Sequence, residues 1–137
     1  MAGTLNVTTI SGASTITGVS TLNAASGVLA TQNGMTGIAK AWVNFNGTGT
    51  VAIRSSFNVS SITDNGTGDY TVNFTTALAD ANYSSIGTAG YSTASKVYLL
   101  QSPYSAVPTT TALRVAVTGD ASNPLDAEYV CVSVFSS

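Results

Sequence analysis

Apolar and polar residues alternate around two Asn-Gly pairs between positions 40 and 75, and this pattern constrains the fold more than any other feature. The alternation has the period of a β-strand with one buried face. Asn and Gly reach positive φ at the least cost, so the strands are expected to reverse at Asn46-Gly47 and Asn65-Gly66. The segment therefore predicts an antiparallel β-meander. Its buried faces are expected to comprise Ala41, Val43 and Phe45, then Val51, Ile53, Phe57 and Val59, then Tyr70, Val72 and Phe74.

Short apolar runs continue the β pattern to the end of the chain. Turn-forming residues separate nearly all of them, and no segment has a convincing helical period. About seven short strands at this spacing predict an all-β, antiparallel β-sandwich over residues 38–137. The expected strands lie at about 38–46, 50–60, 69–76, 83–91, 96–102, 112–118 and 127–135.

Residues 1–37 differ in kind from the rest, because they are rich in Thr, Ser, Gly and Ala with only isolated aliphatic residues. A weak internal echo relates 9–12 (TISG) to 15–18 (TITG), as suits fibrous β structure. The segment cannot bury a core of its own. It is either an extended fibre or trimerisation segment, in which copies of the chain lend one another a core, or a flexible linker.

The run from Tyr129 to Phe135 is apolar on both faces, so as a strand it needs cover on both sides. It is either a central strand of a single sandwich or a strand whose second face meets another subunit. Together with the core-poor residues 1–37, this favours an oligomer.

The composition excludes several classes of function. Only 7% of residues are charged, against roughly a quarter in ordinary proteins, and the net charge of −2 offers no basic surface for nucleic acid. There is no histidine and a single cysteine, Cys131, which is interpreted as a small hydrophobe. Zinc sites and Ser-His-Asp triads therefore cannot form within one chain. We expect no enzyme, no cofactor and no metal, and no apolar run approaches the roughly 20 residues of a membrane span.

Two stretches resemble the carboxy-terminal domains of bacteriophage tail-fibre proteins. They are GIAKAWVNFNGTGTVAIRSSFNVSSITDNGTGDYTVNFTTALADANY, which begins at Gly37, and DAEYVCVSVF near the end. The first residues, MAGTLNVTTISG, are similar to the starts of fibre-like proteins of marine phages. Full fibres also have a tail-attachment domain, which we do not expect within this sequence.

The resemblance implies a homotrimeric, non-enzymatic component of the virion, a tail fibre or spike, that contacts other tail or virion proteins. Its distal β-domain would recognise the host surface, with a cell-surface polysaccharide as the ligand. Two alternatives remain: a purely structural spike or decoration protein that binds no ligand, and a glycan depolymerase with carboxylates at subunit interfaces.

Candidate ligand-binding residues lie in the expected loops, where binding surfaces are common. Aromatic rings beside amides and hydroxyls can hold neutral glycans, which points to Tyr91, Tyr104 and Asn123. Trp42, the only tryptophan, lies within an expected strand and is interpreted as a packing residue.

The few charged residues give little indication of a catalytic or metal-binding site. Asp126 and Glu128 lie two apart in an extended segment, a spacing that a depolymerase could use, although two acids at the start of a strand are usually solvated. Residues 64–69 contain acidic and amide side chains without the spacing of a calcium loop and are interpreted as a turn. Arg54 and Arg114 lie in strands, so each is expected to have a carboxylate or carbonyl partner.

Overall fold

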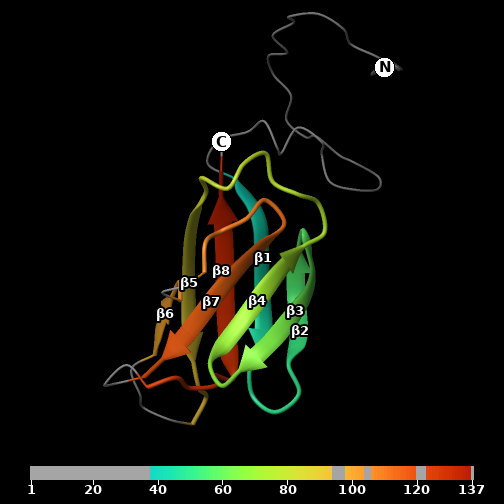
Figure 1. Ribbon diagram of the computed structural model, residues 1–137. Coiled ribbons are helices and arrows are strands. Elements are labelled where there is room, and N and C mark those ends of the chain that lie inside the picture. The colour runs from blue at the N-terminus through green and yellow to red at the C-terminus, as the bar shows by residue number, and fades with distance from the viewer. Residues whose placement is uncertain (1–37, 94–97, 104–105, 120–122, 137) are drawn as a thin grey trace, which may run out of the picture.

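The computed structural model describes residues 38–93, 98–103, 106–119 and 123–136, and these form a sandwich of two antiparallel sheets without a helix (Figure 1). The first sheet has the order β2-β1-β8-β5, and the second has the order β3-β4-β7-β6. The all-β antiparallel prediction is confirmed, with eight strands rather than seven. The strands are β1 (Ala39–Asn46), β2 (Ala52–Phe57), β3 (Val59–Gly66), β4 (Asp69–Phe74), β5 (Ser84–Gly90), β6 (Leu99–Gln101), β7 (Ala112–Thr118) and β8 (Tyr129–Phe135).

The core lies between the two sheets and is built from alternate residues of β1, β4, β7 and β8. Tyr70 and Phe45 are its largest fully buried side chains, and their rings meet edge to face with centroids 5.1 Å apart. Alternation with period two places the next residue of each strand on an outer face. The buried aliphatic members on these strands include Val43, Val72, Leu113, Val115, Val117, Val130, Val132 and Val134.

The predicted meander is wrong within its second strand, because the run at 50–60 is divided into β2 and β3, which belong to different sheets. The alternating run at 50–60 is interrupted by Asn58, which has a φ of 53°. Its side-chain amide donates to the carbonyls of Lys40 (3.0 Å) and Thr76 (3.1 Å), and its Oδ1 accepts the Thr76 N–H (2.8 Å). Of the residues expected on the buried face of this run, Val59 is buried, as predicted, whereas Ile53 is 36% exposed.

The two Asn-Gly turns differ in how they reverse the chain. In the first turn, positive φ was expected at Asn46 or Gly47. The residue that adopts it is Gly49, with a φ of 61°. Asn46 instead donates to the Thr48 carbonyl over 2.6 Å. In the second, Gly66 (129°) and Gly68 (68°) both take positive φ, as the turn chemistry predicts.

β8 is a central strand, with β1 and β5 as its hydrogen-bonded neighbours. Its residues Val130, Val132 and Val134 are buried against the second sheet. The opposite face, which begins at Tyr129, forms part of the outer surface of the first sheet, where Tyr129 is 42% exposed. The strand is therefore central within its sheet, and contact of its outer face with another subunit stays a prediction.

Both ends of the described chain lie at one end of the sandwich. Ala39, at the start of β1, pairs with Phe135, at the end of β8 (Figure 1). The opposite end carries the two glycine turns and the connections that follow β5 and β7. The predicted segment 1–37 lies outside the described residues.

Candidate binding surface

Exposed and half-buried polar and aromatic side chains gather on the outer face of the first sheet, at the end away from residue 38. We call this set the Tyr129 surface: Asn44, Arg54, Ser92, Glu128 and Tyr129. Tyr129 begins β8, and Asn44 and Arg54 come from β1 and β2. A register shift in the β1–β2 pairing places Arg54 between Ser55, which pairs with Asn44, and the next paired residue. Such a bulge redirects a side chain, and here it directs Arg54 towards Tyr129.

Arg54 lies over the ring of Tyr129, with its guanidinium carbon 4.5 Å from the ring centroid. Its Nη1 also donates to Oδ1 of Asn44 over 3.4 Å. The stack is a cation–π contact that orients the guanidinium on the sheet surface. Arg54 was expected to have a carboxylate or carbonyl partner, and the amide oxygen of Asn44 provides it.

Glu128 is held by Ser92 at the edge of the same surface. Ser92 donates its hydroxyl (2.6 Å) and its backbone N–H (3.0 Å) to Oε2 of Glu128. These two bonds are the main causes that lower the pKa of Glu128, with a smaller contribution from the charge of Arg54. The carboxylate is therefore an ionised acceptor beside an aromatic ring and a guanidinium. This combination suits a ligand with many hydroxyl groups.

The predicted ligand-binding residues have different positions. Tyr91 is 41% exposed and follows Gly90, the β5 residue that pairs with Tyr129, so it lies beside the Tyr129 surface. Asn123 is exposed in the connection from β7 to β8, where its carbonyl accepts the Gly119 N–H (2.9 Å). Tyr104 lies outside the described residues.

The sequence interpretation did not assign Arg54, Ser92 or Tyr129 to a site. Tyr129 could have been found from its position at the start of a strand that is apolar on both faces, because its outward side then needs a partner. The bulge that redirects Arg54 has no signal in the sequence.

Trp42 lies farther along the same outer face and is 37% exposed. It pairs with Phe57 on one side and with Ser133 on the other, and Ser133 pairs with Ile86. This row across four strands exposes large apolar side chains, since Ile86 is 66% exposed. Within the described residues Trp42 is therefore not buried in the sandwich core.

Asp126 and Glu128 do not act on the same partners. Oδ1 of Asp126 accepts the N–H of Gly68 (2.7 Å) and lies 2.8 Å from the hydroxyl of Tyr70. Ala127 between them is fully buried. The expectation that Asp126 is a solvated residue is wrong, because it joins the second turn to the segment before β8.

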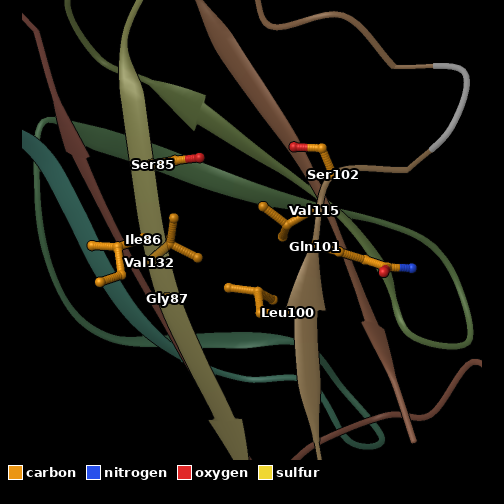
Figure 2. Close-up of a pocket in the computed structure, with 8 residues that line it drawn as sticks. All are labelled: Ser85, Ile86, Gly87, Leu100, Gln101, Ser102, Val115 and Val132. Carbon is orange, nitrogen blue, oxygen red and sulfur yellow. The ribbon is translucent and has the colours of Figure 1, made fainter. Parts of the chain in front are cut away.

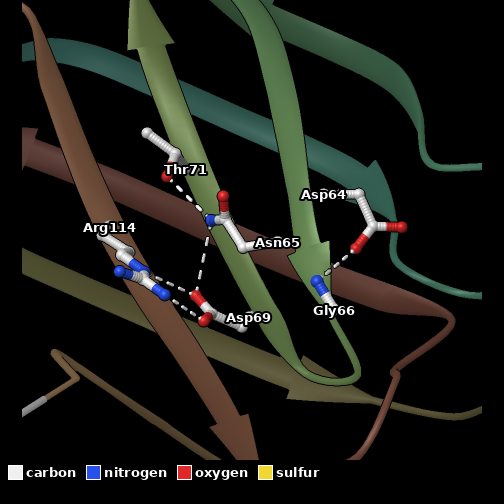
Figure 3. A network of polar contacts seen from close by, with 6 residues as sticks. All are labelled: Asp64, Asn65, Gly66, Asp69, Thr71 and Arg114. Carbon is white, nitrogen blue, oxygen red and sulfur yellow. Dashed lines mark hydrogen bonds and ion pairs between the residues drawn. The ribbon is translucent and has the colours of Figure 1, made fainter.

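The second sheet has a polar network of its own on β3, β4 and β7 (Figure 3). Arg114 makes two contacts with Asp69, one of them from Nε to Oδ1 over 2.8 Å, so its expected carboxylate partner is confirmed. Asn65 donates to Asp69 (3.5 Å) and Thr71 (2.9 Å), and Asp64 accepts the Gly66 N–H (3.0 Å). Arg114 holds the pKa of Asp69 below its ordinary value. These contacts stabilise a turn.

Two kinds of feature are absent from the described part of the chain. It has no group of three or more His, Cys, Asp or Glu side chains that could hold a metal ion. None of its elements is a helix long and apolar enough to cross a membrane. No protein-family model, curated protein or solved structure matches the chain.

Proposed function

We propose that this chain is a homotrimeric component of a bacteriophage virion, similar to tail-fibre proteins, that recognises a polysaccharide on the host surface. The observation that carries the proposal is the Tyr129 surface. It combines a half-exposed aromatic ring, a guanidinium stacked on it and a carboxylate held 2.6 Å from a serine hydroxyl. Aromatic rings bind the apolar faces of sugars, and such polar groups bind their hydroxyls.

The position of this surface supports distal recognition. It lies at the end of the sandwich opposite residue 38, the point at which residues 1–37 join the domain (Figure 1). A domain carried by its amino-terminal side would therefore present Tyr129 and Tyr91 away from the point of attachment. We infer that the amino-terminal side of the domain contacts other tail or virion proteins. The location of the protein would then be the virion.

The exposed apolar row supports the trimeric part of the proposal. Trp42 and Ile86 are large apolar side chains on an outer sheet face, and such patches mark interaction surfaces. Three copies would also multiply weak sugar contacts by avidity. The proposal includes no covalent chemistry, because Asp126 and Glu128 are each engaged with separate groups of the fold.

The experiment is an array of bacterial capsular and lipopolysaccharide glycans probed with the full chain. We expect the protein to bind at least one polysaccharide, and Tyr129→Ala and Arg54→Ala to weaken that binding by about tenfold or more each. Leu99→Ala, at a residue that is 56% exposed on the second sheet, is the matched control and should bind like the wild type.

Two results would reject the proposal in different ways. A trimer that binds none of the polysaccharides would favour the purely structural virion protein. Light scattering tests the trimer separately: three times the chain mass of 13.8 kDa is the expected value, and a stable monomer would reject the homotrimer.

A further inference from the structure

The sandwich has four edge strands, and three of them are protected from pairing with another strand. β2 carries Arg54 and a bulge, β3 carries two register shifts and Asp64, and β6 is only three residues long. Charges, bulges and short length are the devices by which natural sheets prevent unwanted edge pairing. The sequence therefore protects three of the four edge strands from pairing with an added strand.

β5 has none of these devices. Its seven residues, Ser84–Gly90, contain no charge and no proline, and they pair with β8 without a register shift. Among the described strands only β8 is hydrogen-bonded to β5, so its other edge has no strand partner there. An edge of this length without protection is a template for an added strand.

A cavity of about 130 Å³ lies beside this edge, between β5 and β6 (Figure 2). Leu100, Val115 and Val132 supply apolar walls, and Ser85 and Gln101 supply polar groups at its rim. On the outer side of β5, Ile86 is 66% exposed. A strand beside β5 would place alternate side chains in the cavity and next to Ile86.

The chain itself carries a suitable strand. Residues 1–37 contain no charged residue and no proline, and they include β-branched runs such as 4–10 (TLNVTTI). They join the domain at β1, where Ala39 pairs with Phe135 and Phe135 pairs with Ser84 of β5. The chain thus enters the sheet two strands from β5, a separation of about 10 Å. Thirty-seven residues span this easily.

We propose that a strand from residues 1–37 of the same chain adds to the free edge of β5 and fills the cavity between β5 and β6. The strand runs antiparallel to β5, so that the chain leaves it at the end where β1 begins. The first sheet then has five strands in the order β2-β1-β8-β5 followed by the added strand. This inference does not depend on glycan recognition.

Hydrogen–deuterium exchange of the full chain, read by mass spectrometry of peptides, tests the proposal. We expect residues 84–90 and one stretch within residues 1–37 to exchange slowly together. Ser85→Lys places a charge at the rim of the cavity and should speed exchange in both by about tenfold or more. Ala52→Lys, on the opposite edge of the same sheet, should change neither. Slow exchange of β8 in both variants shows that the sandwich remains folded.

Other occupants of the edge give other results. Fast exchange throughout residues 1–37 of the wild type overturns the proposal. Protection of the β5 amides beyond those that bond to β8, without a slow stretch in residues 1–37, means that a strand from elsewhere occupies the edge, and also overturns it. Slow exchange in both segments that disappears on dilution assigns the added strand to a second copy rather than to the same chain. The array experiment is not affected by any of these outcomes.

Discussion

The hydroxyl of Tyr70 lies 2.8 Å from Oδ1 of Asp126, and this contact joins β4 to the segment that leads into β8. The same hydroxyl is 2.7 Å from the carbonyl of Gly47, and Asp126 also accepts the N–H of Gly68. Three segments far apart in the sequence thus meet at one buried phenol. They lie at the end of the sandwich that carries the Tyr129 surface, so the contact stabilises the support of that surface.

Tyr70→Phe should destabilise the protein by about 1–3 kcal/mol, because it removes the single O–H that the Gly47 carbonyl and the Asp126 carboxylate share. Urea unfolding measures the free energy, with Tyr129→Phe as the control at an exposed ring. Equal stability of Tyr70→Phe and the wild type would contradict a structural role for this hydroxyl.

The same phenol predicts sensitivity to alkali. Burial and the Asp126 hydrogen bond raise the pKa of Tyr70 above its ordinary value of 10.0, since both disfavour the phenolate. A raised pKa in the folded state means that the stabilisation is complete below pH 10 and is lost as the pH rises above it. Unfolding free energies measured across this range should fall in the wild type and fall less in Tyr70→Phe. Parallel curves would contradict the assignment.

Asn58 provides a test of the corner between the sheets. Asn58→Gly keeps easy access to positive φ but loses the side-chain hydrogen bonds to Lys40 and Thr76. Asn58→Ala loses these hydrogen bonds and also the easy access to positive φ. We expect both variants to be destabilised, with alanine worse by about 0.5–1 kcal/mol. Urea unfolding of the pair gives the order, and the reverse order would mean that backbone strain at this residue is unimportant.

The ion pair of Asp69 and Arg114 predicts a loss of stability in acid. The bonds from Arg114 lower the pKa of Asp69 below its ordinary value of 3.8, so the folded state favours the carboxylate. Its contribution is complete above pH 3.8 and is lost as the pH falls below that value through the depressed pKa. Asp69→Asn should flatten the acid limb of the stability curve.

A matched control for this prediction is Asp80→Asn. Asp80 accepts the backbone N–H of Asn82 over 2.6 Å, a bond that an asparagine oxygen can also accept. The acid limb should then keep its wild-type slope. The same flattening in both variants would mean that the loss of a negative charge, rather than the Arg114 pair, causes the effect.

Much of the fold follows from alternation. The buried faces of β1 and β4 could be assigned because Val43, Phe45, Tyr70 and Val72 recur with period two and large side chains favour the core. The division of the 50–60 run into two strands could not be predicted, because Asn58 is only one polar residue in an alternating series. Its conformation depends on contacts with Lys40 and Thr76, 18 residues away on each side.

The site was less accessible to sequence reasoning. Tyr91 was assigned because an aromatic residue in a loop signals a binding surface, and the structure places it beyond the strand end next to Tyr129. The stack of Arg54 on Tyr129 depends on a bulge and on the pairing of β1 with both β2 and β8. Pairing across three strands is a long-range property that local pattern does not specify.

The most direct test of glycan recognition is the NMR spectrum of the protein with isotope-labelled tyrosine rings, titrated with an oligosaccharide from a polysaccharide bound on the array. Our account predicts that the ring signals of Tyr129 and Tyr91 shift with saturation, while that of buried Tyr70 does not move. Saturable shifts that leave Tyr129 and Tyr91 unchanged would contradict the assignment of the Tyr129 surface as the glycan-binding site.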